Sequence, residues 1–317
     1  MITLSDLHCA QTRLQGVTVR THLIEFDQGD SLRLLLKPEN QQPIGAFKLR
    51  GAFNKIASLS DDERKRGVIS YSSGNHAQGV AYAARALGVK SVIVMPNNAP
   101  AIKRKATAAL GAEIVLVGPA SDERKTKAEE LAAHHGYVIV PPYNDEKIIA
   151  GQGTIGLEIL EDLPEVEAVF VPVGGGGLIS GVAAAIKTTN PKIRVIGVEP
   201  ELAADAQASL RAGKIVQWPA EQVSRTLADG LRTQSIGDIN FEHMRRYVDD
   251  IVTVSEDEIR QAMKLLAANP NTLAEPSGAV ATAGFLFRRD QLPGARLNVA
   301  IISGGNIEPE MLKELGR

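Results

Sequence analysis

The sequence predicts an α/β fold built from open, mostly parallel sheets. Short runs rich in Val and Ile alternate with Ala-rich stretches of helical spacing, which is typical of parallel strands joined by crossover helices. Glycine-rich or polar loops follow several of these runs, where a strand gives way to a helix. The 317 residues are enough for about two domains. No linker or repeat separates them, so we expect the domains to pack together with a ligand between them.

The elements follow one another in two blocks. In the first block, we expect strands at 68–71, 91–95, 113–117 and near 138–140, and helices at 75–87 and 100–110. Gly88 and Gly111 stand where a residue of left-handed conformation commonly ends a helix. In the second block, we expect helices at about 145–160 and 178–187, and strands at 167–173, 194–198 and 297–302.

Composition excludes several classes of protein. Lys and Arg number 35 against 37 Asp and Glu, so the net charge of -2 provides no basic field for nucleic acid or an anionic membrane. The single Cys9 cannot form an intrachain disulfide. The first residues lack a basic segment followed by an apolar one, and no apolar run is long enough to span a bilayer. We therefore expect a cytoplasmic protein that acts on a small molecule.

Four consecutive glycines, 174–177, follow a predicted strand and open a helix, where free N–H groups and the helix dipole favour a phosphate. The spacing does not match a dinucleotide fingerprint, which needs glycine at its first, third and sixth positions. A formal match at 151–156 follows a segment that looks helical, so the required strand is missing. A tight turn without a ligand remains the alternative interpretation.

Two other polar loops also follow strands. Ser72-Ser-Gly-Asn-His76 places hydroxyls and N–H groups at a helix N-terminus, which suits a carboxylate, although an ordinary helix cap would explain part of it. Ser303-Gly-Gly-Asn306 follows the last strand. Because ligands of open α/β sheets bind at the carboxyl ends of strands, the three loops together predict one site.

Lys48 lies beside Phe47 in a segment with little charge except Arg50. An apolar pocket lowers the pKa of a lysine and frees its neutral amine to form a Schiff base. A solvated surface lysine is the ordinary alternative.

Taken in order, the segments 37–40, 45–51, 72–76, 174–177 and 303–306 resemble the fold-type II pyridoxal-phosphate enzymes, in the serine/threonine dehydratase and serine racemase branch. Further matches lie at 150–154, 227–230 and 275–278. The resemblance implies a tryptophan synthase β-like fold with the cofactor in a cleft between two domains. It implies a lyase that converts a β-hydroxy amino acid to a 2-oxo acid and ammonia by β-elimination.

The resemblance also implies cofactor-binding residues. Lys48 would form the Schiff base with pyridoxal 5'-phosphate, Phe47 would lie against the pyridine ring, and Asn75 would bond the ring hydroxyl. Ser303 would meet the ring nitrogen, and Gly230 would contact the cofactor edge. The phosphate would be held by four backbone N–H groups, those of Gly174, Gly175, Gly176 and Gly177.

For the substrate, the resemblance implies a carboxylate loop formed by Ser72, Ser73, Gly74 and His76. Lys48 would be the catalytic base, and Ser73 would be the acid-base group on the opposite face in a racemase.

Glu199, Ala203 and Asp205 have the spacing of a divalent-cation site in this branch, where the alanine contributes its carbonyl. Such oxygen ligands suit Mg²⁺ or Ca²⁺, and two solvated acids are the alternative.

Two positions depart from the family pattern: Ile44 replaces a hydroxyl residue and Ala46 replaces a serine. The resemblance implies threonine or serine as the substrate. The two changes predict a more apolar pocket, which argues against these simplest substrates and leaves room for a bulkier β-hydroxy amino acid, such as 3-hydroxyaspartate or phenylserine. A serine or aspartate racemase, a β-replacement synthase and a non-catalytic phosphate-binding module are the other hypotheses.

We expect a large domain of residues 1–53 and 144–317, a small domain of residues 54–143, and a homodimer.

Overall fold

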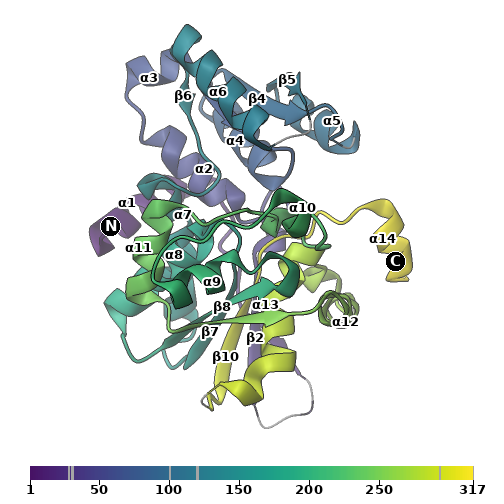
Figure 1. The fold of residues 1–317 in the computed structure, drawn as a ribbon. Helices are drawn as coiled ribbons and strands as arrows, with labels where there is room; N and C mark the ends of the chain where they lie inside the picture. Colours follow the sequence, from purple (N-terminus) through teal and green to yellow (C-terminus); the bar gives the residue numbers. More distant parts are fainter. Residues whose placement is uncertain (28, 30–31, 100, 119–120, 293, 317) are drawn as a thin grey trace.

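The computed structural model describes residues 1–27, 29, 32–99, 101–118, 121–292 and 294–316. It contains two sheets, one above the other in Figure 1, with helices on both faces of each. Every neighbouring strand pair is parallel except β1–β2, so the predicted α/β class is confirmed. Among the described residues, no helix is both long and apolar enough to cross a membrane.

The larger sheet has the order β1-β2-β10-β7-β8-β9. Its strands are β1 (Ile24–Phe26), β2 (Arg33–Pro38), β7 (Ala168–Pro172), β8 (Arg194–Pro200), β9 (Asp250–Val254) and β10 (Leu297–Ile302). One face packs on α12 (Glu256–Leu266) and α13 (Pro276–Arg288), and the other on α8 (Gly177–Thr189) and α11 (Asp238–Tyr247). The central strands β7 and β10 are therefore buried on both faces, which explains why they are nearly continuous apolar runs.

The smaller sheet has the order β5-β4-β3-β6. Its strands are β3 (Val68–Tyr71), β4 (Ser91–Pro96), β5 (Glu113–Val117) and β6 (Val138–Ile139). The helices around it are α2 (Lys48–Ala57), α3 (Asp61–Arg66), α4 (Asn75–Ala86), α5 (Ala101–Ala109) and α6 (Ser121–His135). The prediction for 68–117 is confirmed to within one residue at each described boundary, and Pro100 lies outside the described residues. Gly88 and Gly111 have φ of 65° and 92°, the left-handed conformation expected of them.

The remaining helices connect and cover these layers. They are α1 (Leu4–Leu14), α7 (Glu146–Asp162), α9 (Asp205–Ala212), α10 (Ala220–Val223) and α14 (Pro309–Glu314), with short 3₁₀ turns η1 (Glu39–Gln41), η2 (Glu201–Ala203), η3 (Asp229–Leu231), η4 (Pro270–Thr272) and η5 (Arg289–Gln291). The domain boundaries at 54 and 143 stay a prediction, and α2 runs across the first of them.

The glycines at 151–156 lie inside α7, which confirms that this segment is helical. A Cβ on Gly151 would lie 2.6 Å from the Arg50 carbonyl, and one on Gly153 would lie 2.8 Å from the Gly181 carbonyl. These glycines therefore allow α7 to pack closely against α2 and α8.

Candidate active site

The loops after β3, β7 and β10 carry the predicted site residues, and the segment before α2 joins the last of them. Ala46 and Gly304 form an isolated antiparallel bridge. The Phe47 N–H donates to the Ser303 carbonyl at 3.1 Å. This pairing brings Lys48, the first residue of α2, to the end of the last strand, although 255 positions separate Lys48 from Ser303 in the sequence.

The Lys48 amine lies in a poorly solvated place. It donates to the Pro142 carbonyl at 2.8 Å and lies 5.2 Å from the centre of the Phe47 ring. In the described part of the chain, no carboxylate lies within ion-pair distance of it. Burial lowers the pKa of Lys48 to about 8, so about one tenth of the amine is neutral at pH 7, far more than for an ordinary lysine.

The loop between β3 and α4 is half-buried and ends at buried His76. Nε2 of His76 lies 3.0 Å from the Val140 carbonyl, and its buried Nδ1 has no partner among the described residues. Burial, with the nearby Lys48 amine, lowers the pKa of His76 to about 3. The Gly74 N–H donates to the Ser72 hydroxyl at 3.3 Å, and Ser73 lies between them.

Asn75, the first residue of α4, connects this loop to the end of β10. Its Oδ1 accepts from Nδ2 of Asn306 at 2.7 Å, and its Nδ2 donates to Oε1 of Glu275 at 2.6 Å. Burial, together with the Asp229 charge, raises the pKa of Glu275 to about 8. The loops after β3 and β10 therefore meet at one polar group.

The glycine loop lies between β7 and α8. Gly176 has φ of 91°, which requires glycine. The Tyr143 ring packs so closely on Gly175 that a Cβ there would overlap it. A Cβ on Gly177 would lie 3.0 Å from Cβ of Tyr143, and one on Gly174 would lie 3.2 Å from Cα of Leu231. The bare backbone at the N-terminus of α8 fits a phosphate.

Ser277 links Gly230 to Ser303. The Gly230 N–H donates to the Ser277 hydroxyl at 2.9 Å, and the buried Ser303 hydroxyl donates to the Ser277 carbonyl at 3.3 Å. With Asn75 and the glycine loop, these groups are of the kinds that a ring hydroxyl, a ring nitrogen and a phosphate need, so they fit pyridoxal phosphate.

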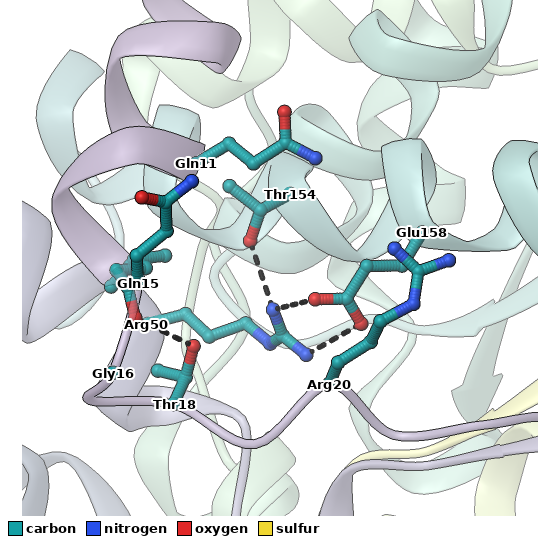
Figure 2. A pocket seen from close by; sticks show the side chains of 9 residues that line it. Gln11, Gln15, Gly16, Thr18, Arg20, Arg50, Thr154 and Glu158 are labelled. Carbon is teal, nitrogen blue, oxygen red and sulfur yellow. Dashed lines mark hydrogen bonds and ion pairs between the residues drawn. The ribbon is translucent and has the colours of Figure 1, made fainter.

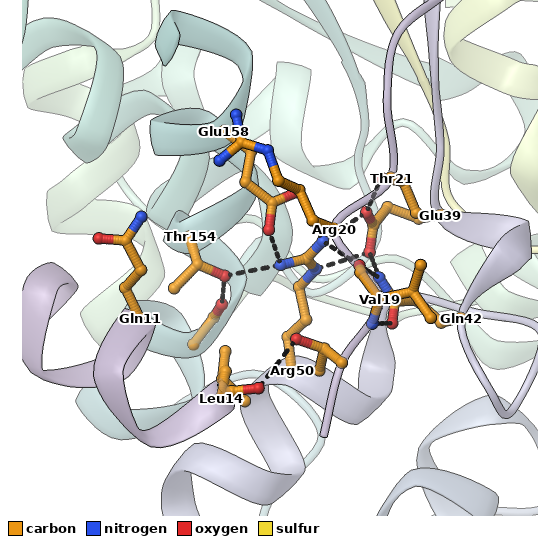
Figure 3. Close-up of polar contacts among 12 residues, drawn as sticks. Gln11, Leu14, Val19, Arg20, Thr21, Glu39, Gln42, Arg50, Thr154 and Glu158 are labelled. Carbon is orange, nitrogen blue, oxygen red and sulfur yellow. Dashed lines mark hydrogen bonds and ion pairs between the residues drawn. The ribbon is translucent and has the colours of Figure 1, made fainter. Parts of the chain in front are cut away.

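A second polar group, which we name the Arg50 cluster, consists of Lys37, Glu39, Arg50, Thr154 and Glu158. Figure 3 shows Glu39, Arg50, Thr154 and Glu158. The Arg50 guanidinium donates to Glu39 at 2.7 Å, to Glu158 at 2.7 Å and to Thr154 at 3.1 Å. The Lys37 amine donates to Glu158 at 2.6 Å. Although burial alone would raise it, the Arg50 charge holds the pKa of Glu39 below its ordinary value. The family-like segments 37–40, 45–51 and 150–154 contribute residues to this cluster, or adjoin those that do. The cluster thus anchors α2 to β2, η1 and α7.

A cavity of about 310 Å³ adjoins the Arg50 cluster (Figure 2). Gln11 of α1 and Gln15, which directly follows that helix, line one side of it, and Arg50, Thr154 and Glu158 line another. None of the predicted site residues lines this cavity, and the polar atoms of Arg50 and Glu158 already have partners. It is separate from the candidate active site.

The predicted cation site lies next to the glycine loop, where β8 ends and α9 begins. The buried Glu199 carboxylate accepts from the N–H groups of Ala206 at 3.0 Å and Gln207 at 2.8 Å. Neither buried oxygen of Asp205 has a hydrogen-bond partner in the described ranges, and burial raises the pKa of Asp205 to about 7. Those ranges contain no group of three or more His, Cys, Asp or Glu side chains suited to a metal. Two carboxylates, one unpartnered, and a backbone carbonyl at Ala203 fit a hard cation.

The sequence did not reveal four groups that complete the site: the Pro142 carbonyl, the Tyr143 ring, Glu275 and Ser277. Glu275 and Ser277 lie in segment 275–278, which matches the family pattern, but the sequence assigned no role to either residue. The Pro142 carbonyl and the Tyr143 ring gave none, because a carbonyl contact and a packing contact leave no local pattern.

The comparisons with known proteins agree with this geometry. Residues 12–304 match the family model "Pyridoxal-phosphate dependent enzyme", and the chain belongs to the pyridoxal-phosphate-dependent enzyme family, within the branch of threonine dehydratases and serine racemases. It is 48% identical to L-threonine ammonia-lyase of Thermotoga maritima, over 99% of this chain and 78% of that protein. It is 44% identical to L-threo-3-hydroxyaspartate ammonia-lyase of Saccharomyces cerevisiae, over 87% of this chain and 83% of that one. The structure of maize serine racemase superposes with a TM-score of 0.94 at 37% identity, over 98% of this chain and 96% of that one.

Proposed function

We propose that this chain is an ammonia-lyase that converts a β-hydroxy amino acid to a 2-oxo acid and ammonia, with L-threonine as its first candidate substrate. The observation that carries the proposal is the Lys48 amine, whose pKa is lowered to about 8 and which donates to the Pro142 carbonyl. Tyr143, the next residue, packs against the glycine loop. Asn75 and Ser303, each held by its own hydrogen bond, supply the polar groups suited to the ring of pyridoxal phosphate. The relatives named ammonia-lyases, at 44% and 48% identity, support it.

Each residue group has a defined task in this reaction. The N–H groups of residues 174–177 hold the cofactor phosphate, and Asn75 and Ser303 orient the ring. When bound, the cofactor supplies an electron sink for the substrate. The loop 72–76 binds the substrate carboxylate through its hydroxyls and N–H groups.

Lys48 removes the Cα proton, for which a neutral amine is required. The β-hydroxyl then leaves and takes up a proton equivalent to the one that Lys48 removed, so that one water is lost. The unsaturated amine tautomerises to an imine, which reacts with one water to give a 2-oxo acid and ammonia. The neutral Ser303 hydroxyl cannot hold the ring nitrogen fully protonated as a carboxylate would, which favours loss of a β-leaving group.

Ile44 and Ala46 indicate which substrate side chain the pocket accepts. Both are buried in the segment before Lys48, and neither side chain offers a hydrogen bond. An apolar wall suits the methyl group of threonine better than the hydrogen of serine. L-threo-3-hydroxyaspartate is the second candidate, supported by the yeast relative.

Racemisation is the alternative activity. Ser73 stands in the carboxylate loop, where a hydroxyl on the face opposite Lys48 would return the Cα proton. The similarity to maize serine racemase supports testing it.

We also infer a divalent cation, Mg²⁺ or Ca²⁺, at Glu199, Ala203 and Asp205, supported by the unpartnered carboxylate of Asp205. The homodimer and the cytoplasmic location stay predictions. Light scattering during gel filtration and fractionation of cells test them.

The decisive experiment compares the wild type with K48A. We expect the wild type to bind pyridoxal phosphate, to be labelled at Lys48 after borohydride reduction, and to form 2-oxobutanoate from L-threonine. K48A should lose at least about 10³-fold in turnover, because both the amine base and the covalent attachment are removed. Chiral analysis of the remaining amino acid measures racemisation. A K48A protein with normal turnover, or a wild type that stays unlabelled, would overturn the proposal.

A further inference from the structure

Glu275 is the N-cap residue of α13 and contacts Asn75, and no step above uses it. Its side chain is buried, with 6% of the residue exposed. Its Oε1 lies 2.6 Å from Nδ2 of Asn75, and its backbone N–H donates to the Gly304 carbonyl at 3.1 Å. A buried carboxyl with no ion-pair partner in the described part of the chain is expensive to maintain.

The contacts around Asn75 fix the orientation of its amide without ambiguity. Nδ2 of Asn306 donates to the Ile44 carbonyl at 2.9 Å, which identifies that atom as nitrogen. The same nitrogen donates at 2.7 Å to Asn75, so the Asn75 atom facing it is oxygen. The other amide atom, which faces Glu275, is therefore nitrogen.

One hydrogen of the Asn75 amide nitrogen remains after the bond to Glu275. An amide NH₂ has two donor hydrogens in its plane, about 120° apart, and Glu275 accepts one of them. Gly304 keeps the space between the two groups open, since a Cβ on it would overlap Oε1 of Glu275 and lie 3.1 Å from Nδ2 of Asn75.

We propose that Glu275 is a positioning residue that holds the Asn75 amide in one orientation, so that its remaining N–H is directed to the ring hydroxyl of bound pyridoxal phosphate. This inference rests on the proposed function, which places the cofactor ring at Asn75. Glu275 itself acts through Asn75 and is not assigned a step in the reaction.

The state of the carboxyl suits this role. Its pKa is raised to about 8 by burial and by the Asp229 charge, so near neutral pH the group is mostly an uncharged acid that accepts through its carbonyl oxygen. Gln at this position would offer the same carbonyl acceptor at similar size, whereas Ala would offer none.

The test uses the full-length wild type, E275Q and E275A, with E258A as the matched control. Glu258 of α12 is a partly buried glutamate bonded at 2.6 Å to Arg288, the last residue of α13, at the opposite end of that helix from Glu275. Two quantities are measured: the dissociation constant for pyridoxal phosphate, and the position of the visible absorption band of the bound cofactor.

We expect E275A to weaken cofactor binding about tenfold, which is the loss of one well-placed hydrogen bond, and to shift the absorption band. E275Q should stay within about twofold of the wild type, and E258A should lose thermal stability without a shift of the band. N75A should show the same shift as E275A, and the double variant E275A/N75A should show no larger one.

Two outcomes separate the inference from the proposed function. A wild type that does not bind pyridoxal phosphate contradicts the proposed function itself. A wild type that binds it, with E275A unchanged in both dissociation constant and absorption band, overturns the role of Glu275 alone. Additive effects of E275A and N75A would overturn it as well.

Discussion

Two buried polar regions of this protein meet at the start of α2, where Lys48 belongs to one and Arg50 to the other, but they differ in how their groups are paired. In the Arg50 cluster, each of the two buried carboxylates accepts from a cation, and no unpartnered side-chain atom remains in the cluster. Lys48 and His76 of the candidate active site and Asp205 of the predicted cation site lack such partners, and the pKa of each departs far from its ordinary value. The paired charges of the Arg50 cluster stabilise the fold, whereas titratable groups without an ion-pair partner are available to bind a ligand.

Breaking the Arg50 cluster should have the largest effect on stability. R50L leaves Glu39 and Glu158 buried without their guanidinium, which should lower the free energy of unfolding by about 3–5 kcal/mol. Denaturant unfolding measures it. The control R260L removes an exposed pair on α12 and should cost at most about 1 kcal/mol. If both variants lose the same small amount, the Arg50 cluster is not an anchor.

The unpaired His76 should make stability depend on pH. Its folded pKa of about 3 lies below the unfolded value of 6.5. Between these values the unfolded state binds the extra proton, so stability is full above pH 6.5 and falls as the pH decreases toward 3. At pH 4.5 the loss should be about 2–3 kcal/mol. H76Q should flatten this part of the profile, whereas H135Q, on the surface of α6, should follow the wild type.

The smallest expected effect concerns Asp205. If its carboxylate is a ligand of a divalent cation, Mg²⁺ or Ca²⁺ at ten times the dissociation constant should raise the free energy of unfolding by about 1.4 kcal/mol. D205N should abolish the cation dependence. Thermal unfolding with and without chelator measures both proteins, and a wild type indifferent to either cation would contradict the cation site.

The sequence predicted the parts of the molecule that are locally encoded. The alternation of apolar runs with Ala-rich segments located β3 to β5, and the loops after β3, β7 and β10 could be expected to share one sheet edge. The short strand β1 pairs antiparallel with β2, and no local pattern marked either of them. The Arg50 cluster was not predicted, although the segments that form it were recognised as family motifs. Charged residues are usually exposed to solvent, so the burial of these side chains could not be inferred before the packing was known.

The loops that form the site could be predicted from the sequence, but the hydrogen bonds that connect their side chains could not. Asn75 and Glu275 are 200 residues apart and touch only because α4 and α13 begin at the same place in space. The roles given to the glycine loop, Ser303 and the carboxylate loop stay predictions for the experiments above to test.

The position of β10 has a consequence for protein synthesis. This strand lies between β2 and β7, so the large sheet remains in two separate parts until residue 302 has been translated. The smaller sheet, complete once β6 is made, can form much earlier, since chains grow at only about 5–20 residues per second. The segment before Lys48 pairs with Ser303 only after β10 has been made, so until then Lys48 stays apart from Ser303, the residue proposed to meet the ring nitrogen of the cofactor.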